Sequence, residues 1–81
     1  MTTLNFSEPV VFLRGDRPKS VRTVLEAATC LMTGWPPVAG KNFADALTIS
    51  LAALEGREVG TDVVREAFIL AVVEAGYSIY T

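Results

Sequence analysis

The sequence contains no histidine and only one cysteine, Cys30, among its 81 residues. The lack of histidine excludes Ser-His-Asp triads and His-ligated zinc, and one cysteine forms neither a multi-cysteine metal site nor an intrachain disulfide. Cys30 is therefore expected to be a reduced, semi-buried structural thiol. No nucleophile with an activating base and no carboxylate pair in an apolar pocket is recognisable. We expect a protein that is not an enzyme and holds no cofactor or metal.

A long apolar run and a positively charged start are also missing. The uncharged stretch 27–40 is interrupted by Gly34, Pro36 and Pro37, and no segment approaches the ~18 apolar residues of a membrane span. The first residues lack the basic region of a signal peptide. We expect one small domain, residues 1–81, located in the cytoplasm and without a membrane partner.

The first 22 residues have the pattern of a β-hairpin. The segment 6–13 is rich in β-branched and aromatic residues, and Pro9 fits at the start of this strand or on an edge. A turn is predicted over 14–18, because Gly15 tolerates positive φ and Pro18 donates no backbone hydrogen bond. A short returning strand over 19–22 would direct Val21 toward the core.

Three helices follow the hairpin. Thr23 and Glu26 form a capping box at the start of the first helix. The second is predicted from about Asn42, as N-cap, to about residue 55, and the third begins with Thr61 as its cap. The glycines placed to end the three helices are Gly34, Gly56 and Gly76. Residues 77–80 alternate apolar and polar, which predicts a short closing strand, so the expected fold is α+β with the order ββααα(β).

The third helix has no polar residue from 67 to 73, which is typical of a helix buried on most sides. Two other helices in one small chain offer too little surface to bury it. A homodimer, or a complex with an unknown protein partner, would supply the missing surface. The candidate interface residues are Ile69, Leu70, Val73 and Trp35.

Two residues have alternative structural interpretations. Trp35 is either an interface anchor or, as we favour, a plug folded over the first helix. Arg65 is either a ligand-binding cation or, as we favour, the partner of Asp62 with its stem covering apolar surface.

Basic residues are concentrated in the predicted hairpin, although the net charge is −2. Arg14, Arg17, Lys19 and Arg22 against Asp16 give residues 14–22 a local charge of +3. One interpretation is a small nucleic-acid-binding regulator that uses these four residues to contact phosphates. The other is a hairpin whose exposed charges prevent edge-to-edge aggregation, and we favour this second interpretation.

A set of short motifs occurs in a recognisable order. They are Pro9-Val10-Val11, Glu26-Ala27-Ala28, Trp35-Pro36, Ala46, Ala53-Leu54-Glu55-Gly56, Arg65-Glu66-Ala67-Phe68-Ile69 and Glu74-Ala75-Gly76. Together they resemble the domain-of-unknown-function family numbered 982, from about Phe6 to Ile79. The resemblance implies a small stand-alone bacterial protein, of the kind found largely in rhizobia and related alphaproteobacteria. It also implies that many members carry a cysteine near Ile49 and Ser50, and it supplies no catalytic residue.

Overall fold

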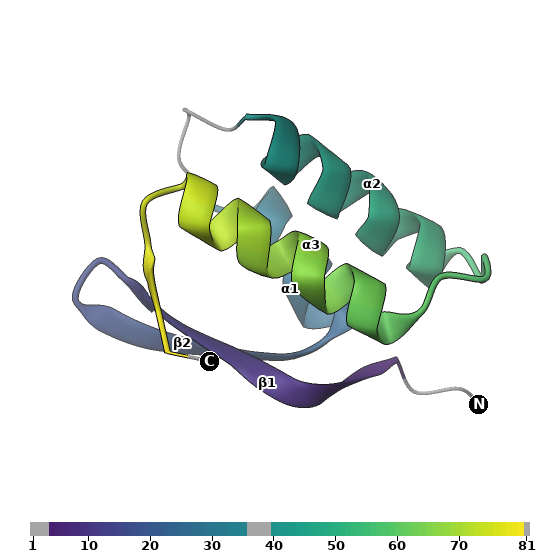
Figure 1. The fold of residues 1–81 in the computed structure, drawn as a ribbon, viewed down its shortest axis with the longest axis horizontal. Coiled ribbons are helices and arrows are strands. Elements are labelled where there is room, and N and C mark those ends of the chain that lie inside the picture. Colours follow the sequence, from purple (N-terminus) through teal and green to yellow (C-terminus); the bar gives the residue numbers. More distant parts are fainter. Residues whose placement is uncertain (1–3, 36–39, 81) are drawn as a thin grey trace.

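The protein folds as a three-stranded sheet with two helices packed on one face and a third helix packed on those two (Figure 1). The structure is a computed structural model that describes residues 4–35 and 40–80. In chain order the elements are β1 (Asn5–Arg14), β2 (Arg17–Thr23), α1 (Val24–Met32), α2 (Lys41–Leu54), α3 (Thr61–Glu74) and β3 (Ser78–Ile79). The predicted ββααα(β) order is confirmed. The predicted Pro36-Pro37 loop lies outside the described residues.

The sheet has the strand order β2-β1-β3, with both neighbours antiparallel to the central β1. Gly15 has φ +70° in the two-residue turn between β1 and β2, where a residue with a Cβ would be strained. The hairpin is longer than predicted, because Pro18 lies inside β2 opposite Leu13 rather than in the turn. An edge strand tolerates this proline, since its missing N–H is not needed by a further neighbour.

Pro9 lies inside β1, which is the central strand, and not at a strand start or on an edge as predicted. The pairing of β1 with β2 is irregular between Asn5 and Val10. A proline is accommodated in such an irregular stretch, because the ladder lacks a regular hydrogen bond there.

The capping box at the start of α1 is formed by the predicted residues. The Thr23 hydroxyl accepts a hydrogen bond from the Glu26 backbone N–H at 3.0 Å. Glu26 Oε1 in turn accepts from the Arg22 backbone N–H at 2.7 Å, one residue earlier than in the standard motif. This exchange fixes the direction in which the chain leaves β2 and enters α1.

Helices α2 and α3 end as predicted but begin differently. Gly56 and Gly76 have positive φ, and each follows a helix whose final carbonyls accept paired backbone bonds of the Schellman type. The N-cap positions are Gly40 and Gly60 rather than Asn42 and Thr61, and neither cap residue supplies a side-chain bond. The start of α2 is therefore satisfied by another part of the chain.

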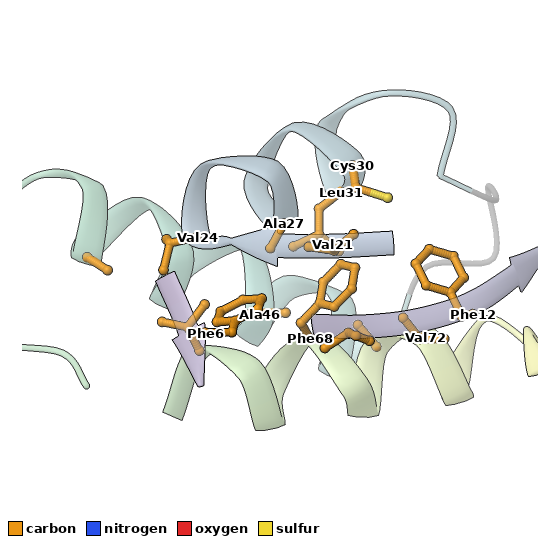
Figure 2. Close-up of a cluster of buried hydrophobic side chains, with 14 residues drawn as sticks. Phe6, Phe12, Val21, Val24, Ala27, Cys30, Leu31, Ala46, Phe68 and Val72 are labelled. Atoms are coloured by element: carbon orange, nitrogen blue, oxygen red, sulfur yellow. The ribbon is translucent and has the colours of Figure 1, made fainter. Parts of the chain in front are cut away.

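The core lies between the inner face of the sheet and the three helices. Figure 2 shows apolar side chains of β1, β2, α1 and α3 pointing toward one another. The rings of Phe12 and Phe68 meet edge to face, with centroids 5.9 Å apart. Val21 is fully buried in β2, as its predicted inward direction requires. Helices α1 and α3 cover one face of the sheet, and α2 packs on these two helices on the side away from the strands (Figure 1).

Candidate functional site

Helix α3 buries one side and exposes apolar residues on the other. Val63, Leu70 and Val73 are 49%, 54% and 55% exposed, and their spacing places them on one side of the helix. The opposite side, which includes Phe68, packs against β1 and α2. This agrees with the expectation that one small chain has too little surface to bury the helix all round, since no other described element covers its outer side. We call Val63, Leu70 and Val73 the α3 face.

The α3 face borders a shallow groove between α2 and α3. Ile69 lies at the other border of the face, half-buried and packed against the core. The groove has a volume of about 220 Å³ and is lined by Asn42, Asp45, Ile49, Val63, Glu66, Ala67 and Leu70. One surface thus combines protruding apolar side chains with a hollow of side-chain size.

Trp35 lies away from the α3 face, at the far end of the core. Its ring is half-buried, with centroids 6.0 Å from Phe43, 6.0 Å from Phe68 and 5.6 Å from Tyr77. These contacts join the end of α1 to α2, α3 and the segment before β3. Trp35 therefore plugs the core against α2, α3 and Tyr77, whereas the predicted plug was folded over the first helix.

Arg65 is joined to β1 and not to the predicted Asp62. Its Nε donates a hydrogen bond to the Glu8 carbonyl at 2.9 Å, in the irregular stretch beside Pro9. This bond satisfies the Glu8 carbonyl, which lies in the part of β1 where the pairing with β2 is irregular. Arg65 therefore stabilises the packing of α3 on the sheet.

The four basic residues of the hairpin do not form one continuous patch. Arg14 Nη2 donates to the Thr33 carbonyl at 2.8 Å, so this side chain connects β1 to the end of α1. In β2 the residues Arg17 and Lys19 share one side of the strand, and Arg22 lies on the other. Arg22 lines a separate hollow with Asn5, Phe6, Pro9, Thr23 and Glu26.

Cys30 is a free thiol, only 4% exposed, on the side of α1 that faces the hairpin. Burial raises the pKa of this thiol above its usual value, and the nearby charges of Arg14 and Lys19 only partly oppose that effect. Arg14 Nη1 lies 3.9 Å from the sulfur. A buried thiol with a raised pKa is a poor nucleophile, which fits the structural role expected for it.

The start of α2 is capped by a residue that the sequence analysis did not identify. Glu74, at the end of α3, accepts hydrogen bonds from the backbone N–H groups of Gly40, Asn42 and Phe43 at 3.0–3.1 Å. These bonds, first of all the one from Asn42, lower the pKa of the Glu74 carboxyl. A helix N-terminus attracts anions, and here the protein's own carboxylate occupies it. No sequence signal pointed to Glu74, because Asn42 was available as a local N-cap residue.

Metal-ligand clusters and membrane-spanning helices are not found in the described part of the chain. Within residues 4–35 and 40–80, no three potential ligands among Cys, Asp and Glu lie together. None of the helices described there has the length and hydropathy needed to cross a bilayer.

Comparisons with known proteins identify a family but no characterised relative. Searches of curated proteins and of solved structures give no match. A family model with the description "Protein of unknown function (DUF982)" matches residues 8–79, which is nearly the whole chain and agrees with the resemblance carried by the sequence motifs. The chain therefore belongs to the DUF982 family of proteins of unknown function.

Proposed function

We propose that this protein is a non-enzymatic protein-interaction module of the cytoplasm and that it forms a homodimer through the α3 face. The observation that carries the proposal is the exposure of about half of Val63, Leu70 and Val73 on one side of α3. Exposed apolar side chains gathered on one side of a small domain mark interaction surfaces. The exposed Glu66 lies between Val63 and Leu70 on this side of α3. Water contact with the apolar side chains is unfavourable, and a partner surface removes it.

A second copy of the chain fits this surface better than a strongly charged partner. An isologous dimer needs a patch that is complementary to itself. The α3 face has protruding side chains, and the adjoining groove of about 220 Å³ offers a place for one of them. Asp45 and Glu66 line that groove, and Glu66 also lines a second hollow together with Arg65, Ile69 and Leu70. Charges of both signs therefore flank the apolar residues.

The dimensions of the face predict a weak dimer. Residues 63–73 of a helix extend over about 15 Å, so the contact is smaller than the ~800 Å² per partner of a standard stable interface. Interfaces of this class dissociate on dilution, with Kd values of about 1 µM to 1 mM. The oligomeric state should therefore depend on protein concentration.

Sedimentation velocity over about 1–500 µM protein tests the proposal. We expect the wild-type protein to shift from monomer to dimer, and Leu70→Glu and Val73→Glu to remain folded monomers. The exposed positions allow these substitutions without loss of the core, whereas Ile69→Glu would disturb packing against it. Met32→Glu is the matched control, because Met32 is 65% exposed on α1 and should not affect association. Dimers that persist in both α3 variants would contradict the proposal.

A further inference from the structure

A second hollow lies on a different part of the molecule, between β2 and α1. Its volume is about 350 Å³, within the range of small-ligand sites. It is lined by Arg14, Lys19, Ser20, Leu25, Glu26, Thr29, Cys30 and Thr33. We call it the α1–β2 hollow, and none of its lining residues belongs to α3 or to the groove beside it.

Two cations converge on this hollow without a carboxylate partner among the described residues. The ion pair found among the described residues joins Arg57 to Glu55, which lie in the segment after α2 and not in this hollow. Arg14 is held by its bond to the Thr33 carbonyl, which leaves its guanidinium fixed at the wall of the hollow. Lys19 lies opposite Phe12 in the register, and hence on the side of the sheet that faces the helices.

The remaining lining groups are compatible with an anion. The one acidic side chain, Glu26, has an Oε1 atom that accepts a hydrogen bond from the Arg22 backbone N–H at 2.7 Å, and its single negative charge is outnumbered by the charges of Arg14 and Lys19. Thr29 and Thr33, which also line the hollow, carry hydroxyls of a kind that donates to anionic oxygens. The charges of Arg14 and Lys19 both act on the Cys30 sulfur, which places their fields in the same small volume.

Leu25 adds an apolar wall. This side chain is 61% exposed although it lies beside the charged groups. A ligand with an anionic group and a small apolar body would contact both kinds of surface, as ligands of small-molecule sites commonly do.

From this arrangement we infer that the α1–β2 hollow binds a small organic anion, with its carboxylate or phosphate between Arg14 and Lys19 and its apolar part against Leu25. This site is independent of the α3 face and goes beyond the proposed dimer. A fixed guanidinium and an ammonium together favour an oxygen anion, since charge-assisted hydrogen bonds are stronger than neutral ones.

NMR titration of the 15N-labelled protein with phenyl phosphate and with inorganic phosphate, at matched ionic strength, tests the inference. We expect saturable shifts at the amides of Ser20, Thr29, Cys30 and Thr33, and tighter binding of phenyl phosphate. Lys19→Gln should weaken binding about tenfold, the effect of losing one charge-assisted hydrogen bond. Arg17→Gln is the matched control, because Arg17 is a β2 cation that does not line the hollow.

Two results would overturn the inference. One is the absence of saturation up to about 10 mM phenyl phosphate, which corresponds to affinity too weak for a site. The other is equal weakening by Lys19→Gln and Arg17→Gln, which would mean general attraction to a basic surface. A single-stranded and a duplex oligonucleotide are titrated in parallel. Tight binding that needs Arg17, Lys19 and Arg22 alike would replace a small-molecule site with a nucleic-acid surface.

Discussion

Ser50 is a polar residue at the fully buried side of α2. It lies one helical turn after Ala46 and one before Ala53, which are also buried. The Ser50 hydroxyl has no hydrogen-bond partner in the part of the chain that the structure describes. An unsatisfied buried hydroxyl costs about 1–3 kcal/mol, and alanine also favours the helix. We expect Ser50→Ala to raise the free energy of unfolding by about 1 kcal/mol, measured by urea denaturation.

A matched exposed position separates this effect from helix propensity. Thr48→Ala also removes a hydroxyl from α2, but Thr48 is exposed, so we expect a change below about 0.5 kcal/mol. Ser50→Cys should stabilise in the same direction as Ser50→Ala, since a thiol is less costly to bury than a hydroxyl. A less stable Ser50→Ala variant would show instead that the hydroxyl makes a hydrogen bond in solution. The cysteine that the family resemblance places near Ile49 and Ser50 fits a buried, apolar position of this kind.

At the scale of elements, Glu74 connects the end of α3 to the start of α2. Its carboxylate accepts three backbone N–H groups that would otherwise lack partners. We expect Glu74→Gln to lower the thermal midpoint at pH 7 by about 4–8 °C, the effect of losing a helix cap in a domain of this size. Glu58→Gln is the control. This substitution removes the same charge, and Glu58 is exposed in the loop before α3.

The contribution of Glu74 should depend on pH. The folded-state pKa of this carboxyl is lowered from its ordinary value of 4.5, so its stabilisation is fully present above about pH 4.5 and is lost as the pH falls through the lower folded value. Calorimetry from pH 7 to pH 3 should therefore show the wild-type midpoint approaching that of Glu74→Gln. A gap between the two proteins that stays constant below pH 4 would contradict this assignment.

These elements also mark how far the sequence could predict the molecule. The Thr23–Glu26 capping box and the helix ends at Gly56 and Gly76 depend on residues within one or two turns, and all were predicted. The Glu74 cap and the Arg65–Glu8 bond join residues 31 to 57 positions apart. No local pattern contains such contacts, because they depend on how α2, α3 and β1 pack.

The same distinction applies to the candidate site. Periodicity predicted that α3 is apolar all round, and the structure determines which side remains exposed. Ile69, Leu70 and Val73 were predicted together, but only the last two are more than half exposed. Val63 was missed as a site residue because it lies outside the uninterrupted apolar run. Predicting that Arg14 and Lys19 lie at one hollow and Arg22 at another likewise required knowledge of the hairpin register.

At the scale of the whole molecule, α1 and α3 lie on the sheet, α2 lies on these two helices, and the fold measures 35 × 23 × 18 Å. A chain of this size buries only about 60–70% of the surface that its unfolded form exposes, so its core alone gives modest stability. Helices cover a single face of the sheet, and the outer side of α3 has no covering element among those described. Association would therefore contribute to the stability of the fold as well as to its function.

If the folded protein dimerises through the α3 face, its thermal stability must rise with protein concentration. A hundredfold increase in concentration stabilises a folded dimer against two unfolded chains by about 2.7 kcal/mol per dimer. We expect the wild-type midpoint to rise by several degrees between concentrations below and above the dimer Kd, measured by calorimetry or circular dichroism. Val73→Glu should have a midpoint independent of concentration, while Met32→Glu should keep the wild-type dependence. A constant wild-type midpoint would identify the monomer as the folded unit, and the α3 face would then be a surface for a different protein.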